Sequence, residues 1–272
     1  MPISKLVLSL ALVAPLGLDG EGDELPQVDP KVVAAAVADL EKAFESEEAA
    51  VRAAAIARHG SVAAPEVVEL VAAAVRDADP SVVGGALEAL RAQAHPAALE
   101  ALHATSKRHK KLRKQPELFA QLLEAIGQHA SPSSIDVLAD DAFEIRERDV
   151  VTARILGLGH VRHERSVRAL MALVTKADRS RTAPHAADFR LSLAFLTGVD
   201  HGDDLDRWVA WWNDAKKTFE LPAEPPKLPR EMQLRYESYW GYEIVYERKT
   251  KREDRGKDPE KGDPEKDERA SG

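Results

Sequence analysis

The sequence contains no cysteine among its 272 residues. This absence excludes disulfide bonds, thiolate zinc sites, cysteine nucleophiles and lipid attachment through a cysteine. Aromatic residues make up only 5% of the chain, and alanine-rich stretches such as AAVRAAAIA stand in for bulky side chains. Small side chains at this density favour helices that pack closely together. Long runs of alternating β-branched residues are also missing, which argues against a protein built from sheets.

Negative charge predominates over positive charge. The chain has 46 acidic and 38 basic residues, and its formal net charge is −8. This excess of negative charge argues against nonspecific binding of nucleic acid by the protein surface as a whole. Any binding of an anionic partner would therefore depend on a local patch.

The N-terminal segment has the pattern of a secretory signal peptide. One lysine, Lys5, precedes an uncharged stretch from Leu6 to Leu18, which is too short to span a membrane comfortably and typical of a signal-peptide core. The usual A-x-A cleavage motif is missing. We expect residues 1–22 to be a signal peptide and the mature chain to be exported to the periplasm or cell envelope, without a transmembrane span. The alternative is a buried N-terminal helix in a cytoplasmic protein, against which Pro15 counts.

Predicted helix starts follow a regular spacing along the middle of the chain. Proline suits the first position of a helix, and capping residues precede it at Asp29-Pro30, Asp79-Pro80 and Ser131-Pro132. With similar starts elsewhere, the sequence predicts helices beginning near residues 30, 47, 65, 80, 96, 116, 132, 149, 163, 185 and 203. Most intervals are 14 to 20 residues, which is one helix and a short turn, repeated.

The predicted helices form pairs. A small residue ends each first helix, with steps of 32, 35, 32 and 39 residues between Gly60, Ala92, Gly127, Gly159 and Gly198. A period in this range is typical of a solenoid, in which each unit buries its apolar face against its neighbours. We therefore predict an all-α solenoid over residues 30–222, with about five helix pairs after one leading helix at about 30–45.

One stretch carries a family resemblance. EEAAVRAAAIARHGSVAAPEVVELVAAAVRDADPSVV resembles a HEAT repeat, with Val-Arg and small residues in a first helix, a glycine turn, a second helix and an Asp-Pro start. Arg52 and Arg190 match the arginine of the family, whereas other repeats have Gly84, Phe119 and Val151 in its place. The resemblance implies a non-enzymatic scaffold that binds a protein partner through the solenoid surface, above all the concave surface of the second helices.

The alternative to a scaffold is a small-molecule-binding protein. Related helical-repeat lyases bind tetrapyrroles, and such an enzyme would need an acid and a base close together in a pocket. We find no such pair in the predicted groove, where alanine, valine and glutamate predominate. We therefore expect no enzymatic activity and no cofactor.

The predicted end of the solenoid holds three tryptophans. Trp208, Trp211 and Trp212 are spaced by three and four residues, which places them on one helix face. The spacing predicts an apolar cap over the last layer; an aromatic ligand box is the alternative. The segment is similar to the closing repeat of exported bacterial HEAT-repeat proteins, which often end in a Leu-Thr-Gly and Trp-Trp pattern.

The stretch ILGLGHVRHERS at 155–166 could be mistaken for a phosphate loop. Gly157 and Gly159 follow a predicted helix, however, and neither the preceding strand nor the third glycine of a dinucleotide site is there. We expect these glycines to let the chain leave the helix with a positive φ and to let neighbouring helices approach closely.

Histidines gather at the predicted turns from first to second helices, where a solenoid would stack them along one edge. The six are His59, His95, His129, His160, His163 and His201. One interpretation is a metal-binding or pH-responsive edge, for which His160, His163 and His201 are weak candidate ligands. The other is local, because a histidine near a helix C-terminus interacts favourably with the helix dipole.

Basic residues gather at the opposite predicted edge, in the connections from one pair to the next. They are Lys107, Arg108, Lys110, Lys111, Arg113, Lys114, Arg179 and Arg181. This pattern predicts a docking point for an acidic protein, with an anionic lipid or envelope polymer as alternatives and a solvated loop as the plain interpretation. Nucleic acid is disfavoured because no aromatic residues interleave the charges.

The C-terminal region divides into a linker, an aromatic segment and a tail. After Pro222 comes the proline-rich AEPPKLPRE, predicted to be extended. The rest of residues 223–246 could form a helix that breaks at Gly241 or a short strand from Tyr242 to Tyr246. Its aromatic residues are a candidate partner-binding motif, with a segment folded back on the solenoid as the alternative: Tyr236, Tyr239, Trp240, Tyr242 and Tyr246. Residues 247–272 are highly charged and are predicted to be disordered.

Overall fold

The computed structural model describes residues 28–242. These fall into two units, residues 28–229 and residues 230–242. The predicted signal peptide, Tyr246 and the charged tail lie outside the described residues.

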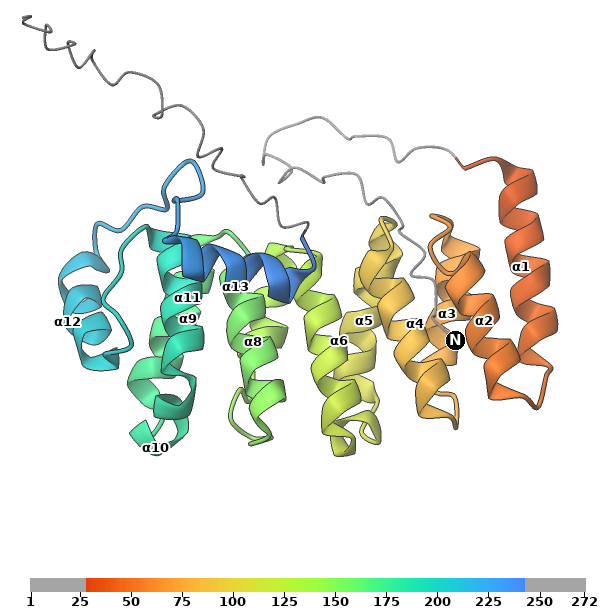
Figure 1. Cartoon of the computed structure of the whole chain (residues 1–272), viewed down its shortest axis with the longest axis horizontal. Helices are drawn as coiled ribbons and strands as arrows, with labels where there is room; N and C mark the ends of the chain where they lie inside the picture. Colours follow the sequence, from red (N-terminus) through yellow and green to blue (C-terminus); the bar gives the residue numbers. More distant parts are fainter. Residues whose placement is uncertain (1–27, 243–272) are drawn as a thin grey trace, which may run out of the picture. The chain divides into compact units, whose positions relative to one another are not determined.

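The first unit is a row of helices that confirms the predicted all-α solenoid (Figure 1). The leading helix is α1 (Pro30–Phe44). Five pairs follow: α2 (Ala49–His59) with α3 (Pro65–Ala74), α4 (Pro80–Ala92) with α5 (Pro96–Arg108), α6 (Pro116–Gln128) with α7 (Ile135–Ala139), α8 (Arg148–His160) with α9 (Glu164–Lys176), and α11 (Ala186–Thr197) with α12 (Leu205–Ala215). Short turns connect them: η1 (Leu112–Lys114), η2 (Pro132–Ser134), α10 (Arg179–Thr182) and η3 (Ala183–His185).

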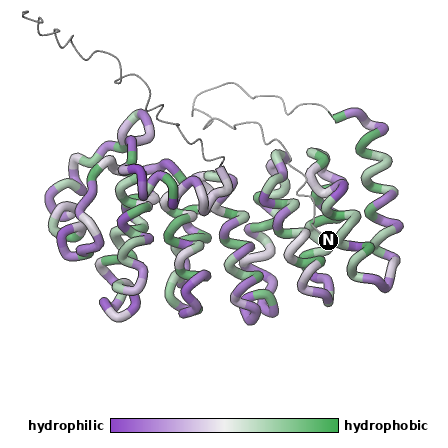
Figure 2. The backbone as a smooth tube through the Cα atoms, viewed as in Figure 1, coloured by the Kyte–Doolittle hydropathy of each residue, from purple (hydrophilic) through white to green (hydrophobic). Residues whose placement is uncertain are grey.

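Two layers of helices enclose the core. The first helices of successive pairs pack on one another from α2 through α4, α6 and α8 to α11, while α3 packs on α5 and α9 packs on both α7 and α12. Hydrophobic and hydrophilic residues alternate along each helix, as expected when one face is buried (Figure 2). Most of the buried apolar residues form one continuous cluster that runs from Ala36 to Trp208.

The predicted helix starts have a clear local cause. The side chains of Asp29 and Asp79 accept hydrogen bonds of 2.8 Å from the backbone N–H groups of Lys31 and Ser81, ahead of a proline at the first helical position. Ser131 caps η2 in the same way, by accepting from the N–H of Ser133 at 3.3 Å. Such caps satisfy backbone donors that the helix itself leaves unpaired.

Gly157 and Gly159 lie inside α8 and do not let the chain leave it, so that part of the prediction is wrong. The predicted close approach is correct. A Cβ atom at position 159 would lie 2.4 Å from the Cβ of Ser192 on α11, and one at 157 would lie 3.6 Å from the Cα of Gly127 on α6. Gly198 is the glycine that ends its helix with a positive φ, of 75°.

Arginine side chains hold helices and turns of the solenoid together. The guanidinium of Arg52 donates to both carboxylate oxygens of Asp77, at 2.7 and 2.8 Å, and Arg190 binds Asp200 in the same bidentate way. Arg154 on α8, which the sequence reasoning missed, is only 3% exposed and donates to the carbonyls of Val137 and Leu138 at 2.9 and 3.0 Å. It thereby satisfies carbonyl groups of the short helix α7. Burial lowers the pKa of Arg154 to about 10, so it remains charged at neutral pH.

Successive layers are also joined at the edge that carries the turns from first to second helices, here called the turn edge. The side-chain amide of Gln93 donates to the carbonyls of Gly60 and Val62 in the preceding repeat, at 3.0 and 2.9 Å. In the next repeat Nε2 of His129 lies 3.0 Å from the carbonyl of Leu90.

The linker after Pro222 contains no helix, but its first part lies against the last repeats. The carbonyl of Pro222 accepts a hydrogen bond of 2.6 Å from Arg162, and Pro226 lies beside Gly198. These contacts hold the chain to the solenoid as far as Pro226.

The second unit contains α13 (Arg230–Trp240). Gly241 follows with a φ of 73°, so the aromatic segment is a helix that breaks at this glycine, one of the two predicted forms. Within the part of the chain that the structure covers, no helix has both the length and the apolar character needed to cross a bilayer.

Candidate partner-binding surfaces

The structure places both predicted groups of basic residues at one edge of the solenoid. Residues 107–114 run from the last turn of α5 through η1, and Arg179 and Arg181 lie on α10, at the lower edge in Figure 1. We call this the connection edge. Six of the predicted residues are exposed and make no ion pair with any other residue between 28 and 242. One of them is Arg181 on α10, and the other five lie together and form what we call the basic cluster: Lys107, Arg108, Lys110, Lys111 and Lys114.

Two of the predicted basic residues bind elsewhere in the protein. Arg113 is 3.4 Å from the carboxylate of Glu144, and its guanidinium stacks over the ring of Phe119. Arg179 pairs with Asp206 and donates to the carbonyl of Val174. These two side chains therefore stabilise the fold and are less available to a partner than the basic cluster.

The connection edge is not uniformly basic. Between the basic cluster and α10 lies the connection from α7 to α8, where Asp140, Asp141, Glu144 and Glu147 are all exposed. Exposed arginines also lie at this edge, at Arg146, Arg148 and Arg181, but acidic residues stand beside the first two. The basic cluster is therefore the densest run of positive charge at the connection edge.

The three tryptophans close the last layer. Trp208 is fully buried and its indole N–H donates to the carbonyl of Gly202 at 2.9 Å. Trp211 contacts the rings of Trp208, Trp212 and Phe219 at centroid distances of 5.8 to 6.0 Å. The rings pack against one another, as expected of an apolar cap.

The histidines of the turn edge each have a local contact. His95 and His163 cap helices by accepting from the backbone N–H groups of Ala97 and Arg165. His59 lies 3.0 Å from the carboxylate of Asp39, and His201 packs edge-on against Trp208. Among residues 28–242 no group of three or more histidine, aspartate or glutamate side chains is arranged to hold a metal ion.

His160 gives the stability of the fold a pH dependence. Burial, reinforced by Arg91, lowers its pKa to about 4, whereas an unfolded histidine titrates near about 6.5. The unfolded chain therefore binds a proton that the folded chain excludes, so this contribution is complete above about pH 6.5 and is lost as the pH falls toward about 4. Burial also lowers the pKa of His103 and of His129, which act in the same direction.

The free energy of unfolding of the wild type should fall as the pH is lowered from about 6.5 to about 4. We expect this fall to be smaller by about 3 kcal/mol in the His160→Gln variant, because glutamine does not titrate. The measurement is urea denaturation at a series of pH values. If the free energy of unfolding changed equally with pH in the wild type and the variant, His160 could not be buried in its neutral form.

The repeated geometry agrees with a comparison with protein families. Residues 37–116, which include the pairs α2–α3 and α4–α5, match the family model of HEAT repeats. This match identifies residues 37–116 as HEAT repeats. A search of curated proteins found no match. The three later pairs have the same order of helices, and HEAT repeats in general are protein-interaction scaffolds and typically non-enzymatic.

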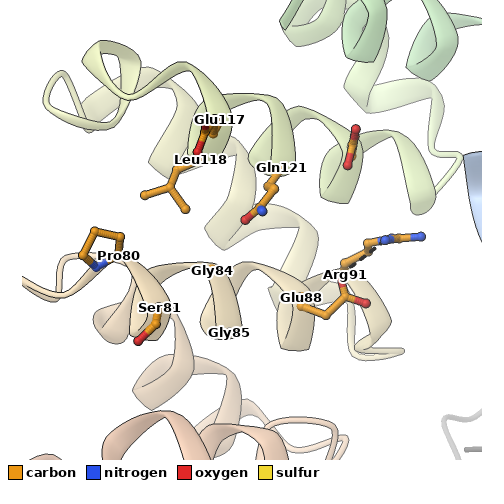
Figure 3. A pocket seen from close by; sticks show the side chains of 10 residues that line it. Pro80, Ser81, Gly84, Gly85, Glu88, Arg91, Glu117, Leu118 and Gln121 are labelled. Carbon is orange, nitrogen blue, oxygen red and sulfur yellow. Dashed lines mark hydrogen bonds and ion pairs between the residues drawn. The ribbon is translucent and has the colours of Figure 1, made fainter. Parts of the chain in front are cut away.

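The solenoid has a groove that could not be recognised in the sequence. It lies between α4 and α6 and has a volume of about 560 Å³. Figure 3 shows Gly84 and Gly85 along α4, with the side chains of Leu118 and Gln121 extending toward them from α6. The glycine pair was a signal for it, because consecutive glycines inside a helix call for an explanation.

The aromatic segment forms its own contacts within the second unit. The rings of Tyr239 and Trp240 meet edge to face at 4.9 Å, and those of Tyr236 and Tyr242 stack at 6.1 Å. Tyr236 and Trp240 are buried and Tyr242 is exposed, so binding of a partner by this segment, with Tyr246 outside the described residues, stays a prediction.

Proposed function

We propose that this HEAT-repeat protein is a non-enzymatic scaffold of the cell envelope that binds an acidic protein partner at the basic cluster. The observation that carries the proposal is the basic cluster itself, five exposed cations in eight residues on a chain of net charge −8. Residues that only keep a loop soluble would be expected to mix both signs, as the neighbouring connection at 140–147 does. The HEAT repeats support protein binding as the general role.

An acidic protein fits the basic cluster better than a membrane or a nucleic acid does. The large apolar side chains that stand exposed among residues 28–242 are Val32, Val51 and Tyr242, none of them in the basic cluster. An amphipathic membrane anchor needs such side chains next to its charges, and single-stranded nucleic acid needs aromatic stacking. Without them, the cluster offers electrostatic steering toward a carboxylate-rich surface.

The test is recovery of the partner by a tagged protein. The protein with a C-terminal tag is expressed in its own host, crosslinked lightly and purified, alongside a variant with Lys107, Lys110, Lys111 and Lys114 changed to Glu. We expect the variant to lose the partner at least about tenfold, because four like-charge contacts each change binding by a fraction of a kcal/mol or more. Fractionation of the same cells locates the protein, which we expect in the envelope.

A matched control separates the basic cluster from net charge. Lys31, Lys42, Lys176 and Lys217 are also exposed, lie outside the cluster, and become Glu in the control variant. The control changes the net charge equally and is expected to retain the partner. Equal recovery with all three proteins, or equal loss in both variants, would contradict docking at the basic cluster.

A further inference from the structure

Two adjacent glycines in α4 are not explained by the packing of the solenoid. Gly84 and Gly85 lie in the interior of the helix, where each glycine destabilises it by about 1 kcal/mol relative to alanine. A Cβ atom at Gly85 would meet no other atom within 4 Å. A Cβ atom at Gly84 would lie 3.3 Å from Oε1 of Gln121, the end of an exposed, flexible side chain.

Other glycines of the first helices show what a packing requirement looks like. A Cβ atom at Gly60 would lie 2.7 Å from the Cβ of Ala89, and one at Gly159 would lie 2.8 Å from the Cα of Ser192. These two glycines allow neighbouring helices to approach. Gly84 and Gly85 instead expose helix backbone along the groove between α4 and α6 (Figure 3).

The groove has a predominantly negative lining. Its charged residues are three glutamates and one arginine, and the arginine, Arg91, is 3.3 Å from the carboxylate of Glu88. Glu117 is exposed on the α6 side. The amide of Gln121, between the two helices, can donate to or accept from a peptide backbone.

We infer that this groove binds an extended, basic segment of a protein partner. The backbone of the segment would run over Gly84 and Gly85, since glycine is the residue that permits close approach to a backbone. A lysine or arginine side chain of the segment would lie beside Glu117, in complementary charge. The inference rests on the proposed scaffold function, and it adds a second binding surface of opposite sign to the basic cluster.

The dimensions of the groove favour a peptide over a compact cation. Its lining runs along α4 from Pro80 to Arg91, which at about 1.5 Å per residue is about 16 Å of helix. An extended chain covers that length with about five residues. A single metal ion would occupy only a small part of that length, and competition with spermine tests a linear polyamine as the alternative.

The experiment measures binding of a defined peptide to the full chain. The probe is a fluorescein-labelled hexapeptide of alternating glycine and lysine, followed by fluorescence anisotropy at about 0.15 M salt, where distant charges are screened. The same peptide with glutamate in place of lysine is the charge control. We expect the lysine peptide to bind and the glutamate peptide not to bind.

Variants then locate the binding. Gly85→Leu fills the groove and is expected to weaken binding at least about tenfold, while the thermal midpoint stays equal or rises because leucine is the better helix former. Glu117→Gln removes one charge and is expected to weaken binding about two- to fivefold. The matched control, Glu66→Gln on α3, removes an exposed glutamate outside the groove and should leave binding unchanged.

Three outcomes would overturn the inference. Wild type and Gly85→Leu could bind the peptide equally, Glu66→Gln could weaken binding as much as Glu117→Gln, or spermine could displace the peptide at equal or lower concentration. The four-lysine variant of the basic cluster should still bind the peptide. If the wild-type protein captures its partner but does not bind the lysine peptide, peptide binding in the groove is refuted and docking at the basic cluster is not. If it binds the peptide but captures no partner, docking at the basic cluster is refuted and peptide binding is not.

Discussion

Alanine in place of Gly159 is expected to lower the free energy of unfolding by about 2 kcal/mol, although alanine is the better helix former. The new Cβ atom would lie 2.4 Å from both Cβ and Oγ of Ser192, and 2.8 Å from its Cα. Relief requires a shift of α11 away from α8, and that shift would also stretch the 3.0 Å hydrogen bond from Ser192 to the carbonyl of Ile155. Urea denaturation followed by circular dichroism measures the loss.

Two further variants test the cause of this loss. Gly85→Ala makes the same chemical change where there is open space, so it should raise the free energy of unfolding by about 0.5 to 1 kcal/mol. Ser192→Gly removes the atoms that the new methyl group meets, so the double variant with Gly159→Ala should be more stable than the two separate losses imply. Additive losses in this double-mutant cycle would contradict a steric contact between the two positions.

The second large effect is expected at the cap. Trp208→Ala should destabilise the last layer by about 3 to 5 kcal/mol, because it removes a fully buried indole and its hydrogen bond to Gly202. In a solenoid each repeat contacts only its neighbours, so the loss should be local. Hydrogen exchange should show reduced protection in α12 and the turn before it, with α2 to α6 nearly unchanged.

Trp208→Phe serves as the matched control for the cap. It keeps a buried aromatic ring but loses the N–H donor and part of the ring volume, so it should lose much less protection than the alanine variant. Uniform loss of protection from α1 to α12 in the alanine variant would show that the solenoid unfolds as a single cooperative unit.

The helix pairs could be predicted from the sequence because their causes are local. Asp79 and Pro80 start α4 through contacts with residues two and three positions away, and the apolar spacing of each helix follows from its own face. The predicted starts near 30, 65, 80, 96 and 116 coincide with observed helices for this reason. The prediction was least accurate for the second helix of the third pair, because α7 is only five residues long and follows a separate 3₁₀ turn.

The features that were missed depend on residues far apart in the chain. The sequence places Arg154 on a helix but does not show what its side chain contacts. Its guanidinium finds two carbonyl acceptors only because α7 packs beside α8. Likewise, the partners of Arg113 and Arg179 stand 31 and 27 residues away. Spacing along one segment identifies a cluster of charge, but it does not show which charges are already neutralised across the edge.

The hydrogen bonds at the turn edge act as a hinge between neighbouring layers. Gln93 joins the second pair to the first from a buried position, and His129 joins the third pair to the second from a partly buried one. The connection edge has pairs such as Arg113 with Glu144, which water and salt weaken. The first three pairs should therefore separate more easily at the connection edge than at the turn edge. Bending between the second and third pairs would change the spacing of the contacts that a partner makes with the basic cluster.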